Sequence, residues 1–241
     1  MIRALFVYVY IALGTALVLP WLILWTVLAK NPDALYFTAM RAMRLLLRLT
    51  GIRVHVEGLE NIPSGPAVFA ANHISALDPM AFIPAIPRRV AILVKTELFK
   101  IPILGTAMRV SQFVPVDRGV KESAALSVAR CVEHLKQGMS FAIYPEGTRS
   151  PDGRLRPFKR GAFSMAVQAG VPVVPVSIAG AQKLMRKGSW KISGGDVGVR
   201  FGDPVQATEN TLDGRDELLA RVESLIAQAL PPDQQPLPRR T

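Results

Sequence analysis

The first fifty residues are the most apolar part of the chain. Residues 4–29 contain no charged side chain, and as one helix they would be about 39 Å long, enough to cross a hydrocarbon core of ~30 Å. Pro20 lies inside this stretch and is expected to kink or divide the helix, because proline has no backbone N–H. The pattern predicts a membrane anchor that either spans the bilayer or enters one leaflet and returns. The short link at Lys30–Asp33 favours the second form.

Residues 34–50 are predicted to form a second helix, which has a basic face. Arg41, Arg44 and Arg48 fall on one side of it, and much of the remaining surface is Leu, Met, Tyr and Phe. This pattern is typical of a helix that lies in the lipid headgroup layer. The alternative is a solvated basic stripe on a helix packed against the rest of the protein. These arginines outweigh Arg3, so a spanning anchor would place the following residues in the cytoplasm.

Residues 51–230 alternate short apolar runs with amphipathic stretches. Strands are expected at Arg53–Val56, Ala67–Ala71, Val90–Val94, Gln112–Val116, Phe141–Tyr144, Val173–Ile178 and Val197–Phe201. Helices are expected at Met80–Ile83, Lys121–Gln137, Gly161–Gln168 and Arg215–Leu230. The alternation predicts an α/β domain with a mixed, largely parallel sheet of about seven strands flanked by helices. The proline-rich, polar tail at 231–241 is predicted to be disordered.

The charge balance indicates an anionic partner. Lys and Arg number 29 against 18 Asp and Glu, which gives a formal net charge of +11. Acidic lipid headgroups, phosphorylated substrates or nucleic acid would each suit such a chain. Nucleic acid is the weakest choice. The sequence has a single cysteine, too few for a cysteine-based zinc finger, and it has no RNA-binding aromatic motif.

His73 and Asp78 are candidates for acid–base chemistry. They follow an apolar strand and are five residues apart, so on one continuous helix they would diverge by about 140°. They can meet if His73 lies in a turn and Asp78 in the first turn of the next helix. Asp78 would then hold one ring nitrogen, and the other would act as a general base. Ser75 is a possible nucleophile, but none is needed if the substrate carries the attacking hydroxyl. A structural histidine bonded to a carboxylate is the alternative.

A second polar cluster follows another apolar strand. The segment Tyr144–Ser150 concentrates a carboxylate, a glycine, hydroxyls and an arginine where open α/β sheets place their ligands. An arginine can grip phosphate oxygens in a bidentate manner, and a lysine beside a helix N-terminus makes an anion site. The candidate substrate-binding residues are Lys95, Arg118, Glu146, Gly147, Thr148, Arg149 and Lys159.

Four blocks, in this order, resemble the glycerolipid acyltransferase family, most closely its 1-acylglycerol-3-phosphate acyltransferases. The blocks are Asn72–Asp78, Phe113–Arg118, Tyr144–Ser150 and Val171–Val176. The resemblance covers about residues 55 to 180, and its first and third blocks together are highly specific. Tyr144 stands where phenylalanine is commoner in the family, a change that is not expected to alter the chemistry.

The resemblance implies both the fold and the reaction. A fatty acyl group would move from acyl-CoA or acyl-carrier protein to the sn-2 hydroxyl of 1-acylglycerol 3-phosphate, giving phosphatidic acid, with no metal and no cofactor. His73 would take the hydroxyl proton, and Asp78 would orient His73. It further implies that Arg118, Glu146, Gly147 and Arg149 hold the glycerol phosphate. Val171, Pro172 and Pro175 would line the site wall or bind the acyl donor; they also suit a plain core strand.

Other functions stay open from the sequence. Glycerol 3-phosphate or another lysophospholipid could be the acceptor. A metal-dependent phosphoesterase could use His73, Asp78 and Glu146, and a membrane adaptor would need no chemistry at all. The chain is expected at a membrane, with its catalytic domain facing the cytoplasm (the inner membrane if bacterial), where acyl thioesters are made.

Overall fold

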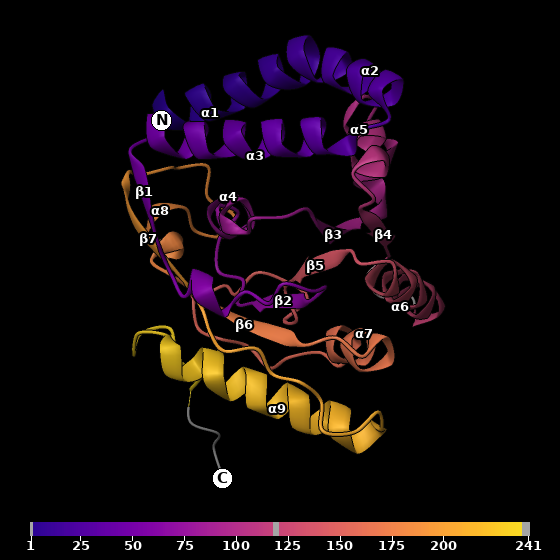
Figure 1. Ribbon diagram of the computed structural model, residues 1–241. Helices are drawn as coiled ribbons and strands as arrows, with labels where there is room; N and C mark the ends of the chain where they lie inside the picture. Colours follow the sequence, from indigo (N-terminus) through magenta and orange to yellow (C-terminus); the bar gives the residue numbers. More distant parts are fainter. Residues whose placement is uncertain (1, 118–120, 238–241) are drawn as a thin grey trace.

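The computed structural model describes residues 2–117 and 121–237, and its centre is a seven-stranded sheet (Figure 1). The strand order is β1-β7-β6-β2-β5-β3-β4, and every neighbouring pair is parallel except β6 and β7. The strands are β1 Ile52–Glu57, β2 Val68–Ala71, β3 Val90–Lys95, β4 Val114–Val116, β5 Ser140–Ile143, β6 Val173–Ala179 and β7 Gly195–Phe201. The predicted mixed, largely parallel sheet is confirmed.

Helices cover both faces of this sheet. The α-helices are α1 Ile2–Leu13, α2 Leu19–Ala29, α3 Pro32–Leu49, α4 Asp78–Phe82, α5 Leu104–Val110, α6 Lys121–Lys136, α7 Gly161–Ala169, α8 Ala181–Leu184 and α9 Leu212–Ala229. The 3-10 turns are η2 Leu59–Asn61, η3 Ile83–Ala85 and η4 Thr96–Lys100, and η1 Gly14–Val18 is a π-helical turn. In Figure 1, α3 and α4 lie on one side of the sheet, and α6, α7 and α9 lie on the other.

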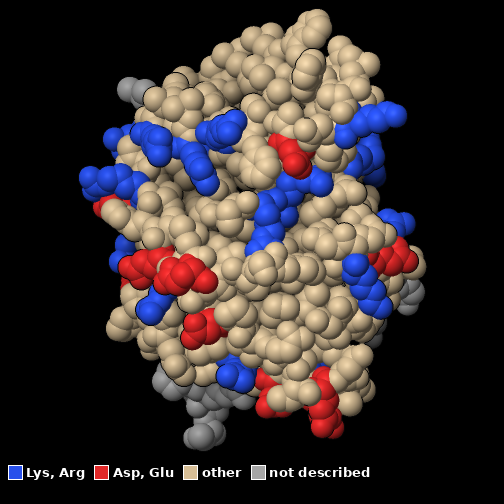
Figure 2. All heavy atoms as spheres, viewed as in Figure 1, with Lys and Arg blue, Asp and Glu red and all other residues tan. Residues whose placement is uncertain are grey.

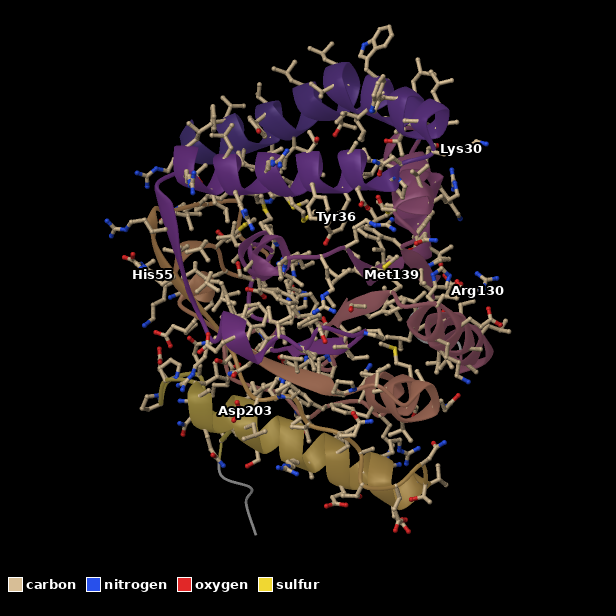
Figure 3. All side chains as sticks on the ribbon, viewed as in Figure 1. Lys30, Tyr36, His55, Arg130, Met139 and Asp203 are labelled. Carbon is tan, nitrogen blue, oxygen red and sulfur yellow. The ribbon has the colours of Figure 1, made fainter. Side chains whose placement is uncertain are left out.

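The central strands are apolar along their whole length because they are buried on both faces. In β2, Phe69 and Ala71 belong to the core under α3 and α4, whereas Val68 and Ala70 belong to the core under α6, α7 and α9. Side chains alternate along a strand, so one short strand joins both cores. A buried tyrosine also ties the layers, since the hydroxyl of Tyr36 accepts a hydrogen bond from the β3 backbone at 3.2 Å (Figure 3).

The N-terminal helices form a hairpin on the outside of the domain. α1, η1 and α2 run alongside α3 in Figure 1, and the Tyr10 hydroxyl donates to the Ala42 carbonyl at 3.3 Å. η1 precedes Pro20, whose missing N–H disrupts regular helical hydrogen bonding, so the predicted irregularity is a π-helical turn. Lys30 then adopts a left-handed conformation, and Asn31 caps α3 by accepting from the backbone of Asp33.

The outer surface of this hairpin is apolar. The helix over Arg3–Ala29 has a mean hydropathy of 2.1 and is long and apolar enough to cross a membrane. Leu17, Trp21, Trp25 and Leu28 are each more than 60% exposed. In Figure 2, the upper surface above α3 is formed almost wholly by uncharged residues. The predicted anchor is therefore an exposed apolar helix packed on the basic second helix.

The start of β4 and the segment after α9 differ from the sequence-based expectations. β4 begins at Val114 and not at Gln112, because Gln112 has a positive φ of 61° that ends the preceding turn. Residues 231–237 are ordered, since Gln234 is buried, its amide donates to the Ile178 carbonyl at 3.2 Å, and its side-chain oxygen accepts from Gly180. The predicted disorder therefore does not describe 231–237, and 238–241 lie outside the described residues.

Candidate active site

The candidate site lies where the parallel strands β2 and β5 end. His73 follows β2 and Glu146 follows β5, and these strands are neighbours in register. Asn72 fixes the end of β2, because its side chain donates to the Ile178 carbonyl at 2.9 Å and accepts from the Ile178 amide at 2.7 Å. Asn72 is therefore a positioning residue, and its sequence signal is its place beside His73 at the start of the first block.

His73 and Asp78 meet in the arrangement that their spacing predicts. His73 lies in the turn, Asp78 is the first residue of α4, and Nδ1 of His73 is 2.8 Å from Oδ2 of Asp78. The same Oδ2 accepts hydrogen bonds from the backbone amides of Ile74 and Ser75, each at 2.8 Å. The imidazole is 14% exposed and the carboxylate is fully buried. Nε2 is therefore the ring nitrogen available to a substrate.

The surroundings of Asp78 suit a buried carboxylate that orients a histidine. Burial raises the pKa of Asp78, whereas His73 and the amides of Ser75 and Ile74 lower it. The hydroxyl of Ser75 donates to the Met185 carbonyl at 2.8 Å and accepts from the Leu77 amide. Ser75 thus closes the turn, and its hydroxyl is not placed as a nucleophile.

Tyr144 fixes the plane of the imidazole. Its ring stacks on His73 with centroids 3.9 Å apart and planes at 18°, and Phe82 contacts it edge-on at 6.0 Å. The Tyr144 hydroxyl is buried and has no hydrogen-bond partner among the described residues. Burial raises its pKa well above the usual value. The stacking uses only the ring, which phenylalanine would also supply.

The Tyr144–Ser150 loop forms hydrogen bonds with both the amide and the carbonyl of His73. Oε1 of Glu146 accepts from the His73 amide at 2.6 Å, and the Ser150 amide donates to the His73 carbonyl at 2.7 Å. Glu146 is buried, and its Oε2 has no partner among the described residues. Glu146 thus positions His73, whereas the resemblance implied a contact with substrate.

A cavity of about 480 Å³ opens beside the His73 ring. Lys95 at the end of β3, Lys159 before α7, and Gly147 line it, together with mostly aliphatic side chains from β3, β5 and α7. Gly147 has a φ of +75°, and a Cβ there would lie 2.9 Å from Nζ of Lys159. The left-handed backbone favours glycine at this position, and a larger residue would push the Lys159 side chain aside. The cavity combines positive charge with room for hydrocarbon.

Comparison with known proteins agrees with this geometry. Residues 53–179 match the family model described as Acyltransferase. The chain belongs to the acyltransferase family. It is 40% identical over 163 residues to a chloroplastic 1-acyl-sn-glycerol-3-phosphate acyltransferase of Brassica napus, covering 66% of this chain and 47% of that one. The chain thus spans about half the length of that relative.

Two further relatives are covered more fully. The human 1-acyl-sn-glycerol-3-phosphate acyltransferase alpha is 36% identical over 190 residues, which are 76% of this chain and 67% of that one. The crystal structure of the 1-acyl-sn-glycerophosphate acyltransferase of Thermotoga maritima superposes with a TM-score of 0.83 at 29% identity, covering 95% of this chain and 93% of that one. Nearly the whole architecture is therefore shared with that acyltransferase.

Not every predicted site residue of this acyltransferase lies at the cavity. Thr148 and Arg149 are half-buried beside Gly147 but do not line it, and the Arg149 carbonyl accepts from Lys187 at 2.8 Å. Arg118 lies outside the described residues, although Asp117 before it lines the cavity.

The beginning of the fourth block lies away from His73. Val173 pairs with Val68 at the start of β2, so Val171 and Pro172 stand at the amino ends of these parallel strands, opposite the cavity. Pro175 lines a separate hollow with Gly202. The structure does not place Val171, Pro172 or Pro175 on the cavity wall. The first two stand at the amino ends of the strands, whereas the reacting groups follow the carboxyl ends, and Pro175 lines the hollow beside α9. Among the described residues, no group of three or more His, Cys, Asp or Glu is arranged to hold a metal ion.

Glu146 predicts a pH-dependent stability for this acyltransferase. Burial raises the pKa of Glu146 from 4.5 to about 7. Between these pH values the folded protein holds a proton that the unfolded chain releases, so stability falls as the pH rises. The loss reaches about 3 kcal/mol above pH 7.

Glu146→Gln should remove this dependence, since the amide oxygen still accepts from His73 but does not titrate. Urea unfolding in detergent should show wild type losing stability relative to the variant between about pH 5 and about pH 8. A constant difference between the two proteins across that range would contradict the prediction.

Proposed function

We propose that this acyltransferase moves a fatty acyl group from an acyl thioester to the sn-2 hydroxyl of 1-acylglycerol 3-phosphate, producing phosphatidic acid. The observation that carries the proposal is the His73–Asp78 pair beside a cavity with aliphatic walls and two lysines. Such a cavity suits an amphiphile with an anionic end. The names of the relatives support the same acceptor.

The chemistry follows from the two ring nitrogens of His73. Asp78 holds Nδ1, so Nε2 takes the proton as the acceptor hydroxyl attacks the thioester carbonyl. The tetrahedral intermediate collapses with loss of the thiolate, which takes that proton from the imidazolium. The ester forms as the thioester breaks, and no acyl-enzyme is needed. The donor is acyl-CoA or acyl-carrier protein, because both present the same thioester, and we expect no metal or other cofactor.

Lys159 and Lys95 are the cavity groups that we assign to the acceptor phosphate. Arg149 lies next to Gly147 and would join them only if its side chain turned towards the cavity. Losing a charge-assisted hydrogen bond costs about 1.5–3 kcal/mol, which is roughly 10- to 100-fold in an affinity. Lysine at 159 also donates its backbone amide to the Pro145 carbonyl at 2.8 Å, a contact that does not depend on the side chain.

Lys159→Gln should therefore raise the KM for 1-acylglycerol 3-phosphate about 10- to 100-fold, with a smaller change for the acyl donor. Initial rates with both substrates varied will measure this. Lys191→Gln is the matched control, since Lys191 is exposed and does not line the cavity. Equal KM values for the two variants would remove Lys159 from the phosphate site.

The acceptor itself is tested by comparing three compounds with the wild-type enzyme. The kcat/KM should be highest for 1-acylglycerol 3-phosphate, lower for glycerol 3-phosphate, which lacks the chain, and lowest for monoacylglycerol, which lacks the phosphate. Equal use of monoacylglycerol would contradict recognition of the phosphate. A preference for glycerol 3-phosphate would indicate that the enzyme adds the first acyl chain and not the second.

We also propose that the helical hairpin holds the enzyme on a bilayer. Burying the exposed apolar side chains of α1 and α2 in lipid is favourable, and the basic face of α3 suits anionic headgroups. α1 and α2 lie along α3, and α3 packs on the sheet, so we favour insertion into a single leaflet over a crossing. The catalytic domain would then face the cytoplasm, the source of the acyl thioester.

A further inference from the structure

A second cavity lies across α4 from the catalytic one. It also measures about 480 Å³ and is bounded by α3, β1 and the segment from α4 to η3. Its floor is aliphatic and includes Leu47, Ile52, Val54, Val56 and Met80. We call it the α3–α4 groove.

The rim of the α3–α4 groove is positively charged. Arg44 and Arg48 are one helical turn apart on α3, so their side chains leave the same face. The guanidinium of Arg48 has no ion pair or hydrogen bond among the described residues, while Arg44 donates to the Pro84 carbonyl. Arg53 also lines the groove but is held by Asp196 through two contacts of 2.9 Å. No acidic side chain of the described part of the chain lines the groove.

An aliphatic floor with unneutralised arginines on its rim fits one class of ligand. An anionic phospholipid carries a phosphate for the guanidinium groups and hydrocarbon for the floor. The groove is also well placed to receive one, because α3 lies directly beneath the apolar helix formed by α1, η1 and α2. In Figure 2, Lys and Arg side chains gather below the uncharged upper surface on the side where α3 meets β1.

We propose that the α3–α4 groove binds one anionic phospholipid of the bilayer, separately from the substrates in the catalytic cavity. The phosphate contacts Arg48 and Arg44, and part of one acyl chain lies along the floor. This inference rests on the proposed attachment of the hairpin to a membrane, and it adds a lipid that is bound without being consumed.

The bound lipid supports the catalytic pair through α4. Pro79 and Ile83 line the catalytic cavity, whereas Met80 and Ala81 line the groove. α4 is only five residues long and begins with Asp78, so a lipid in the groove adds contacts to the side of this helix that faces away from the catalytic cavity. The lipid therefore raises kcat and leaves the KM for the acceptor nearly unchanged.

Native mass spectrometry of the full-length protein in detergent, titrated with phosphatidylglycerol, tests the binding. Wild type should retain one phosphatidylglycerol per chain, and Arg48→Gln should weaken this about fivefold or more. Arg41→Gln is the matched control, since Arg41 is exposed on the same helix but does not line the groove. Equal weakening by both variants, or no retained lipid, overturns the proposal, because a general surface attraction does not distinguish Arg41 from Arg48.

Rates in phosphatidylcholine vesicles with increasing phosphatidylglycerol test the coupling. The kcat of wild type and Arg41→Gln should rise with phosphatidylglycerol, while Arg48→Gln keeps its basal rate and responds several-fold less. Activation by inorganic phosphate in place of the lipid would show a simple anion site and contradict the proposal. Binding is measured without acyl transfer, so an inactive protein that retains lipid would refute only the proposed reaction. An active protein that retains none would refute only the lipid site.

Discussion

Purified His73→Ala enzyme is expected to lose acyl transfer while remaining folded. Among the described residues, His73 supplies the cavity with its one imidazole, and its Nε2 is free to take the hydroxyl proton. General base catalysis contributes typically 10²–10⁴-fold, so the rate should fall on the order of 10³-fold or more. The main-chain contacts of residue 73 with Glu146 and Ser150 do not need the ring, so the variant should keep its fold and its circular dichroism. The midpoint of thermal unfolding should fall, because the stacking on Tyr144 and the bond to the buried Asp78 are lost.

Two companion variants separate this mechanism from its rivals. Asp78→Asn should leave a small residual rate, because the amide loses the charge that orients His73 and stabilises its protonated form. Ser75→Ala should keep most of the activity, since the Ser75 hydroxyl is bonded to the Met185 carbonyl. A Ser75→Ala enzyme as inactive as His73→Ala, yet equally well folded, would indicate an acyl-serine intermediate. Full turnover by His73→Ala would remove the general base from the mechanism.

Disrupting the apolar hairpin should have the second largest effect. Removing residues 1–30 should release part of the protein from membranes and reduce the rate on bilayer substrate more than on a soluble short-chain acceptor. The acceptor and product are amphiphiles, and an enzyme that leaves the bilayer must extract them at a large hydrophobic cost. The truncation also uncovers α3, because Ala4 and Val7 are buried against the core, so its stability must be measured alongside.

A point variant avoids that complication. Trp21 and Leu28 are 71% and 72% exposed, so Trp21→Glu with Leu28→Glu leaves the packing of α1 on α3 intact. Each charge placed in hydrocarbon costs about 2 kcal/mol or more, and the pair should weaken vesicle partitioning on the order of 100-fold or more. Vesicle sedimentation measures the partitioning. Gln206→Glu serves as the charge control, since Gln206 is exposed in the loop between β7 and α9. Unchanged sedimentation, or a wild-type protein that is soluble after lysis without detergent, would contradict the membrane assignment.

The fold could be predicted largely because its strands are buried on both faces and read as separate apolar runs. Residues 68–71 and 173–179 are examples, and their boundaries are close to the observed ones. α5 was missed because its surroundings, from Ile101 to Val110, are apolar without a clear period, and Ile103 enters the helix with a φ of 65°. The segment around Gln234 was predicted to be disordered because it is polar. It is ordered because the Gln234 side chain forms hydrogen bonds with the distant backbone groups of Ile178 and Gly180.

The site could be predicted as far as its chemistry is local. His73 and Asp78 lie within one turn and helix start, so their spacing alone allowed the observed contact. The role of Glu146 depends on β5 lying next to β2, which brings its carboxylate to the His73 amide. Val171 and Pro172 show the same limit, because the end of the sheet at which they stand depends on the direction of β6. The α3–α4 groove joins residues that are more than thirty positions apart in the sequence, beyond any local pattern.

Mass spectrometry of the products of the wild-type enzyme tests the central claim most directly. The purified protein would receive 1-acylglycerol 3-phosphate and an acyl thioester with an isotope label in its acyl chain. We predict one product, phosphatidic acid with the labelled chain at sn-2, formed in equal amount with the released thiol and absent with His73→Ala. Labelled free fatty acid, inorganic phosphate or a labelled protein in place of that ester would contradict acyl transfer to the lipid hydroxyl by the His73–Asp78 pair.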